Sequence, residues 1–287
     1  MHALWIRLPV LVQAVVTGLV VAAAGTLPWA ALVGTNLKHQ PNLPWSVPIM
    51  AVYLWLFWRY VRGGGWPRST SATRRARSRA NVLPADLWGP ALLAGMLGLA
   101  SVLLLQGVLG RLVALPQQRD LDASQYPALT VLAWVLMGAV VAGVVEETAF
   151  RGYLQAPIEL RHGPVLAILA AGSLFGLLHF THAEVTLALL PYYLAVAAVY
   201  GALAHLTDST LPSMALHGAG NAFSAFDLFA RGRSEWQLSE APQPLVWETG
   251  PDAAFFANAA ALLVVGSAAL WAFAELSRAA ERWRTRR

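Results

Sequence analysis

Apolar residues fill most of this chain in blocks that are separated by short polar or basic segments. Turn residues and charges bound eight blocks, at roughly 8–33, 46–61, 86–113, 127–160, 164–182, 185–205, 211–230 and 253–275. A helix that crosses a bilayer needs about 20 mostly apolar residues, and runs of that kind recur along the chain. The pattern therefore predicts an all-α fold, a polytopic transmembrane bundle of about eight helices.

Composition supports a membrane environment. Of 287 residues, 57% are hydrophobic and 12% are charged, whereas soluble chains carry about 25% charged residues. The absence of cysteine excludes disulfides, a thiolate nucleophile and cysteine-ligated zinc. The first block resembles a signal peptide as far as Ala24, but its apolar run continues toward Val33, so we expect a retained first span. We predict a single membrane domain over residues 1–287.

The net charge of +5 comes from arginines concentrated in a loop at 62–85 and a tail at 276–287. Basic segments between spans mark the cytoplasmic side, so we expect both segments and both termini in the cytoplasm of a multi-pass protein of the plasma (inner) membrane. The loops predicted outside, around 36–44, 120–126 and 234–252, are poor in basic residues or mixed in sign. The basic loop should touch anionic headgroups of the lipid bilayer, and we expect no nucleic-acid partner.

Ionisable residues inside apolar blocks are costly, and three polar clusters occur there. The first contains Glu146, Glu147 and Arg151 at the end of the apolar run that begins at Val131. On a helix, Glu147 and Arg151 are four positions apart with the acid first, which favours an ion pair. That pair would leave Glu146 without a neutralising partner, a state that suits a general base or acid.

The second cluster contains Phe175, Gly176 and His179. Phe175 and His179 share one helix face, and Gly176 leaves room for a neighbouring backbone or a substrate. Gly163 and Pro164 should form a turn, with Glu146 17 positions before Gly163 and His179 16 after it. At 1.5 Å per residue both side chains would lie about 25 Å from the turn, so they can meet.

The third cluster contains His217 and Asn221, which project from one helix face. Small residues between them, at 218–220, permit close helix packing. Because this block starts soon after Pro212, counting along the helix places His217 nearer the cytoplasmic surface than His179. A tilted helix or a cytoplasmic cavity would be needed to bring the two histidines together.

Taken in order, the three clusters resemble the three motifs of the CAAX protease and bacteriocin-processing (CPBP, or Abi) family. The resemblance covers residues 127–225, which would form the catalytic core. It implies an eight-helix intramembrane fold with a cytoplasm-facing cavity, and an endopeptidase that hydrolyses a peptide or membrane-protein substrate with an activated water.

The resemblance also implies roles for the motif residues. Glu146 would activate the water, and His179 and His217 would hold it or polarise the scissile carbonyl. Asn221 would donate to the developing oxyanion, while Glu147 and Arg151 would orient the first carboxylate. Phe175 and Gly176 would line the substrate cavity.

Two questions stay open from the sequence. Glu146, His179 and His217 could hold a catalytic zinc ion, or the same atoms could hold water without any cofactor. We favour the metal-free mechanism because no His-Glu-x-x-His helix occurs. The alternative function is a non-catalytic membrane scaffold or bacteriocin self-immunity protein in which the polar residues only specify helix packing.

Overall fold

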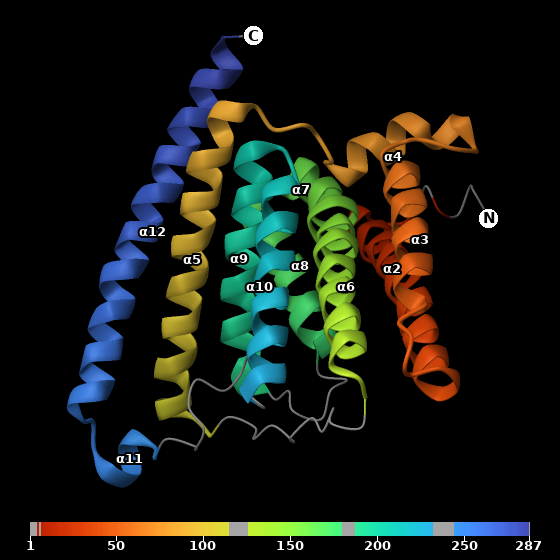
Figure 1. Ribbon diagram of the computed structural model, residues 1–287. Helices are drawn as coiled ribbons and strands as arrows, with labels where there is room; N and C mark the ends of the chain where they lie inside the picture. Colours follow the sequence, from red (N-terminus) through yellow and green to blue (C-terminus); the bar gives the residue numbers. More distant parts are fainter. Residues whose placement is uncertain (1–4, 6, 115–125, 180–186, 232–243, 287) are drawn as a thin grey trace.

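The computed structural model describes residues 5, 7–114, 126–179, 187–231 and 244–286, except for the side chains of 225 and 227–231. Over these ranges the chain is helical and contains no strand (Figure 1). Each of the eight predicted blocks overlaps a helix, which confirms the all-α bundle. The helices are α2 (Val10–His39), α3 (Ser46–Val61), α5 (Ala85–Leu112), α6 (Ala128–Glu147) with α7 (Ala156–His162), α8 (Pro164–His179), α9 (Leu190–Thr207), α10 (Leu211–Arg231) and α12 (Ala253–Thr285).

Several of these helices have the length and apolarity of membrane spans. In lipid a backbone must satisfy its own hydrogen bonds, so long apolar segments fold as helices. Within the described ranges five segments qualify, namely Val10–His39, Ala85–Leu112, Ala128–His162, Leu187–Thr207 and Ala253–Thr285. The shorter helices α3 and α8 are also apolar. The chain is therefore a multi-pass membrane protein.

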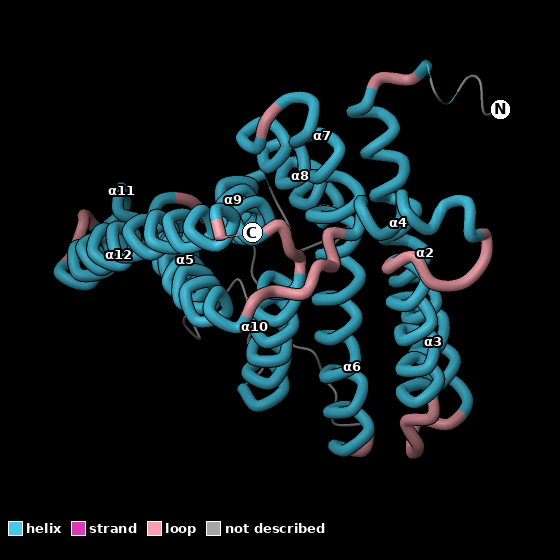
Figure 2. Tube along the Cα trace, turned by 90° about the horizontal axis from the view of Figure 1, so that it is seen from above, coloured by secondary structure: helices cyan, strands magenta, loops and turns pink. Residues whose placement is uncertain are grey.

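The helices pack mainly as neighbouring pairs. Helix α12 lies along α5 at one edge, α10 lies along α6, and α8 lies along α9 in the middle (Figures 1 and 2). Helix α2 packs against the segment that follows α6. The three sequence motifs consequently fall on the end of α6 with the segment that follows it, on α8 and on α10.

The first span continues beyond its predicted end at residue 33. Helix α2 reaches His39 because the buried side chain of Asn36 organises the turn that follows. Its amide nitrogen donates to the carbonyls of Gln40 and Leu43, and its oxygen accepts from the backbone N–H of Ser46. The predicted loop at 36–44 thus begins inside a helix. Of the other two predicted loops, residues 120–125 and 234–243 lie outside the described residues.

The basic loop at 62–85 contains a helix that the sequence did not predict, α4 (Ser71–Ser78), preceded by a 3-10 turn (Arg68–Thr70). Its arginine-rich sequence shows no apolar repeat. Arg74 anchors it to the end of α3, where its guanidinium donates to the carbonyls of Tyr60 (2.9 Å) and Gly64 (2.8 Å). A cationic side chain at a helix C-terminus satisfies carbonyls that lack partners within the helix.

The last span also extends beyond its predicted end at residue 275. Helix α12 continues to Thr285, so most of the predicted basic tail is helical. A short helix, α11 (Val246–Thr249), precedes it. Asp252 caps α12 by accepting from the backbone N–H of Phe255 and forms an ion pair of 3.1 Å with Arg111 of α5. This contact fixes the start of α12 to the end of α5.

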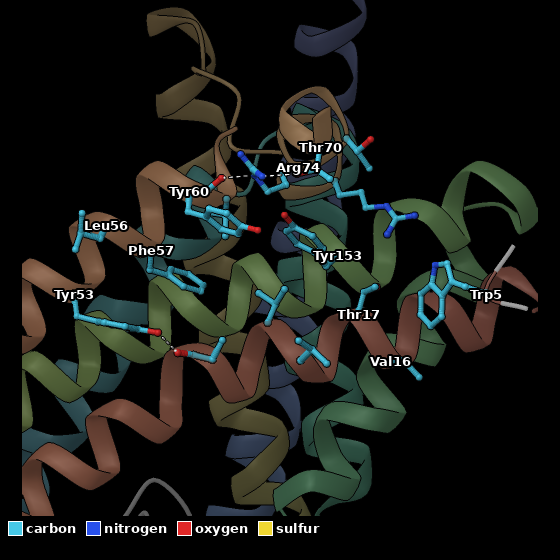
Figure 3. A pocket seen from close by; sticks show the side chains of 16 residues that line it. Trp5, Val16, Thr17, Tyr53, Leu56, Phe57, Tyr60, Thr70, Arg74 and Tyr153 are labelled. Carbon is cyan, nitrogen blue, oxygen red and sulfur yellow. Dashed lines mark hydrogen bonds between the residues drawn. The ribbon is translucent and has the colours of Figure 1, made fainter. Parts of the chain in front are cut away.

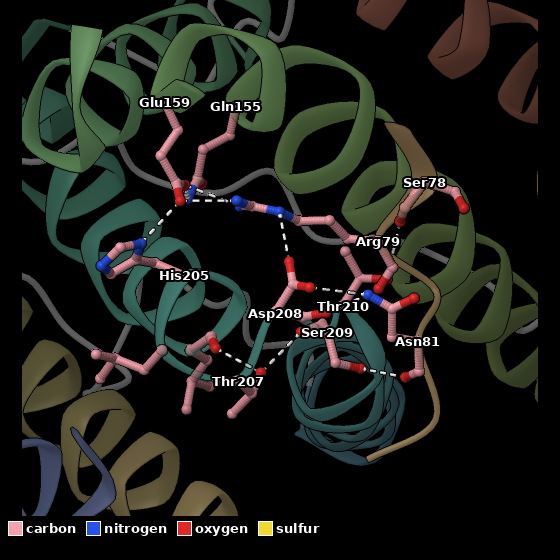
Figure 4. Close-up of polar contacts among 12 residues, drawn as sticks. Ser78, Arg79, Asn81, Gln155, Glu159, His205, Thr207, Asp208, Ser209 and Thr210 are labelled. Atoms are coloured by element: carbon pink, nitrogen blue, oxygen red, sulfur yellow. Dashed lines mark hydrogen bonds and ion pairs between the residues drawn. The ribbon is translucent and has the colours of Figure 1, made fainter. Parts of the chain in front are cut away.

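At the opposite end of the bundle, a polar cluster that we call the Glu159 clamp joins the basic loop to two helices (Figure 4). The Glu159 carboxylate accepts from both terminal nitrogens of Arg79 at 2.7 and 2.8 Å, and lies 2.8 Å from Nδ1 of His205. Arg79 also lies 3.3 Å from Asp208 at the turn between α9 and α10. The clamp thus holds the end of the basic loop against α7 and α9.

Candidate active site

The helix that carries the acid pair changes geometry at the site. Helix α6 ends at Glu147, and a π-helix (Thr148–Gln155) follows before α7 begins. Such segments are rare and occur frequently at functional sites. All eight residues of this π-helix are buried. The sequence predicted one uninterrupted helix over 127–160, because no proline or charge run between 148 and 155 signals the change.

Glu147 is the most enclosed member of the acid pair, with no exposed side-chain surface. Its Oε1 lies 2.8 Å from Nδ1 of His217, and its Oε2 lies 3.4 Å from Nε of Arg151. The ion pair predicted between Glu147 and Arg151 is therefore present. The hydrogen bond to His217 was not predicted, because it joins residues 70 positions apart in the chain.

His217 is held between Glu147 and an aromatic ring. The Tyr200 ring of α9 stacks on the imidazole at 5.2 Å between centroids, with 12° between the planes. Since an ionised Glu147 can only accept, its hydrogen bond requires a proton on Nδ1 of His217. Nε2 of the same ring lies 3.7 Å from Oε2 of Glu146.

Glu146 differs from its neighbour in exposure, since 23% of its side-chain surface is accessible. The 3.7 Å between Glu146 and Nε2 of His217 exceeds the length of a direct hydrogen bond. Polar atoms at this separation can be bridged by one water molecule. The geometry therefore brings a partly accessible carboxylate and an oriented imidazole nitrogen within 3.7 Å of each other, where one water molecule could bind to both.

Arg151 is almost completely buried, with 1% of its surface exposed. Its guanidinium carbon lies 5.4 Å from the ring centroids of Phe175 and of Tyr200, which is cation–π distance. Glu147 supplies the opposite charge. A buried cation needs such compensation, so the arginine, the acid and the two rings form one interdependent unit.

His179 lies beside this unit at the end of α8. Its Nδ1 lies 2.8 Å from the carbonyl oxygen of Phe175, and its ring contacts Phe175 and Tyr193 at centroid distances of 4.5 and 4.6 Å. The centroid of Phe175 is also 6.3 Å from that of His217. The Phe175 ring thus contacts both histidines, although counting along the helices had suggested a difference in depth.

Two further predicted residues lie at the edge of this arrangement. Asn221 is half-buried on α10, one turn beyond His217. Gly176 faces α9, since a Cβ there would come within 3.2 Å of the Cβ of Tyr193. The space that Gly176 leaves is therefore occupied by a neighbouring helix, one of the two options that the sequence left open.

Close packing of α6 and α10 brings Glu147 and His217 together. A Cβ on Gly143 would lie 2.9 Å from the backbone nitrogen of Gly218 and from the carbonyl oxygen of Met214. Only a glycine allows this approach of the two backbones. The small residues after His217 were predicted to permit such packing, and the structure shows the partner helix.

Sequence reasoning missed Tyr193 and Tyr200, which supply two of the aromatic walls. They are seven positions apart on α9 and therefore lie on one face, a spacing that is visible in the sequence. The apolar part of the α9 block carries no charged residue, so its pattern predicts only a membrane span. Two tyrosines on one face of a membrane helix are the signal that could have identified this wall.

The predicted zinc ligands do not form a three-ligand centre as they lie. No group of three His, Asp or Glu side chains close enough to hold a metal ion occurs in the described part of the chain. Nδ1 of His217 bonds to Glu147, and Nδ1 of His179 lies against a backbone carbonyl.

The fold and the cluster define a class, a multi-pass membrane protein with acid and imidazole groups inside its helical bundle. Residues 128–223, which are 96 of the 287 residues, match the family model of the Rce1-like type II CAAX prenyl endopeptidases. The match confirms the resemblance to the CPBP family and includes all three motifs. This similarity of about a third of the chain to the CAAX-protease family supports an intramembrane peptidase in general. No curated protein and no solved structure matches the chain.

Proposed function

We propose that the protein is an intramembrane endopeptidase in which Glu146 activates a water molecule for attack on a peptide bond. The observation that carries this proposal is the pairing of Glu146 with Nε2 of His217 across 3.7 Å. A water molecule between these atoms could give one proton to the Glu146 carboxylate while its oxygen attacks the scissile carbonyl carbon. General base catalysis of this kind contributes about 10²–10⁴-fold to a rate.

The remaining residues have supporting roles in this proposal. Glu147 accepts a hydrogen bond from Nδ1–H of His217 and so keeps Nε2 directed at the water, and Arg151 balances the charge of Glu147. His179 contacts the substrate or holds the water from the α8 side. Asn221 stabilises the oxyanion that forms at the attacked carbonyl. Glu146 then returns its proton to the amine of the leaving peptide, which completes the hydrolysis.

The substrate that we propose is a peptide segment or a membrane protein that reaches the bundle from the bilayer. We place the site toward the cytoplasmic side of the plasma membrane, because the basic loop and the basic end of α12 lie at one end of the bundle (Figure 1).

Metal analysis of the active enzyme would decide between metal-dependent and metal-free hydrolysis.

A quenched-peptide library tests the proposal directly. Purified protein in detergent should release fluorescence from a subset of peptides, and the Glu146→Ala variant should release none above background. Glu281→Ala serves as a matched control, since this carboxylate is exposed on α12. Equal cleavage by the wild type and Glu146→Ala would exclude the proposed chemistry.

A further inference from the structure

A groove separate from the motif residues lies between α2, α3, α4 and the π-helix (Figure 3). Its volume is about 720 Å³, which is within the roughly 300–1,000 Å³ of small-molecule sites. Figure 3 shows Tyr60, Thr70 and Arg74 on one side and Val16 and Thr17 of α2 on the other. None of the six predicted catalytic residues lines it.

The floor of the groove is apolar and faces the surroundings of the bundle. Val16 and Val20 of α2 and Leu56 of α3 line it, and their exposed fractions are 40%, 62% and 52%. At the end farthest from α4, the hydroxyl of Tyr53 donates to the carbonyl of Ala24 and joins the two walls. The part of α3 that lines the groove, from Tyr53 to Val61, spans nine residues, or about 12 Å, which suits part of a hydrocarbon chain.

The end nearest α4 is cationic. Arg74 and Arg77 both line it. The Arg74 guanidinium donates to neutral oxygens, including the carbonyls of Tyr60 and Gly64, so its charge is not cancelled by these bonds. Within the described residues neither arginine forms an ion pair with a carboxylate, and no Asp or Glu lines the groove. The sequence contains no acidic residue from Arg59 to Ala85.

We propose that this groove binds one anionic phospholipid of the bilayer. Arg77 would contact the phosphate, and the positive charge of Arg74 would add to the attraction. One acyl chain would lie on the apolar floor. Basic pockets between membrane helices on the cytoplasmic side bind anionic headgroups in this way. A zwitterionic lipid would bind more weakly, because its headgroup also carries a positive charge, which the two arginines would repel.

Native mass spectrometry of the delipidated full-length protein tests the proposal. Phosphatidylglycerol should bind with one tight site, and phosphatidylcholine of the same chain length should bind more weakly. Arg77→Gln should lower the phosphatidylglycerol affinity about fivefold, the effect of one cation near an anionic headgroup. Arg68→Gln is the matched control, because Arg68 is exposed in the same loop and does not line the groove. Thermal unfolding should be unchanged in both variants.

Three outcomes would overturn the proposal. Equal affinity for the two lipids would indicate a groove for hydrocarbon alone. Equal losses in Arg77→Gln and Arg68→Gln would indicate a diffuse attraction to the basic loop. Displacement of the lipid by inorganic phosphate at the same concentration would indicate an anion site without a role for the acyl chain. All these measurements report lipid binding, so their results do not depend on whether the protein cleaves peptides.

Discussion

At the scale of residues, the two neighbouring acids at the end of α6 have different surroundings. Glu147 is fully enclosed and contacts both His217 and Arg151, whereas Glu146 is partly exposed and lies near the second nitrogen of His217. Consecutive residues on a helix point in different directions, so one acid can be structural while the next remains accessible. This difference predicts different effects of the same substitution.

Glu147→Gln should destabilise the protein, while Glu146→Gln should not. Removing the charge of Glu147 leaves the buried Arg151 without compensation, a loss of about 3–5 kcal/mol when one partner of a buried ion pair is removed. Glu146 makes no comparable contact with the arginine. Thermal unfolding in detergent would measure both variants against the wild type. Equal unfolding temperatures for the two variants would contradict the separate roles.

The sequence predicted the local contact and missed the distant one. The Glu147–Arg151 pair follows from a spacing of four residues. The contact of Glu147 with His217 depends on how α6 and α10 pack, which no local pattern encodes. The spacing of Tyr193 and Tyr200 places both rings on one helix face, but the stacking of Tyr200 on His217 depends on the position of a third helix.

At the scale of elements, the crossing of α6 and α10 determines whether the acids reach the imidazole. Gly143 and Gly218 allow the two backbones to approach closely one turn before Glu147. The π-helix that follows also packs tightly, since a Cβ on Gly152 would lie 2.8 Å from the carbonyl oxygen of Arg77 at the end of α4. The segment that carries Glu147 and Arg151 is therefore held by helices on two sides.

Gly143→Ala should weaken the fold and reduce cleavage more than Gly138→Ala in the same helix. The new Cβ at 143 would press on backbone atoms, which cannot move independently, at a cost of about 1–3 kcal/mol. At position 138 the nearest atom is Nε1 of Trp29 at 3.4 Å, an ordinary contact. Unfolding temperature and cleavage rate would be measured for both variants. Equal behaviour would show that the crossing tolerates extra volume.

Element positions could be predicted from the sequence, but element geometry could not. The eight apolar blocks mark helices because length and apolarity are sufficient in lipid. Helix α4 has no apolar repeat and depends on Arg74 reaching the end of α3. The π-helix packs closely against α4 at Gly152, a tertiary contact that the apolar pattern of the sequence does not encode.

At the scale of the whole molecule, the polar ends of the bundle determine its predicted orientation. Helix α12 contains 33 residues and is about 50 Å long, whereas the hydrocarbon core is about 30 Å thick. Its basic end, which Figure 1 shows projecting beyond the other helices, should therefore extend into the aqueous phase. The positive-inside rule places this end in the cytoplasm.

Cysteine labelling tests this orientation without background, because the chain contains no cysteine. In intact cells, a membrane-impermeant maleimide should label Trp247→Cys, which lies before α12 and is 65% exposed. Thr285→Cys, exposed at the other end of α12, should react only after the membrane is permeabilised. The reverse labelling pattern would contradict the predicted topology.

The most direct measurement of the central claim is a double-mutant cycle between Glu146 and His217 on peptide cleavage. If both groups act on one water molecule, Glu146→Gln and His217→Asn should each lower the rate about 10²–10⁴-fold. The double variant should then be no slower than the worse single variant, since residues that act as a unit are not additive. Two results would contradict the shared-water mechanism. One is a double variant whose loss of rate equals the product of the two single losses, and the other is a Glu146→Gln enzyme that retains its rate.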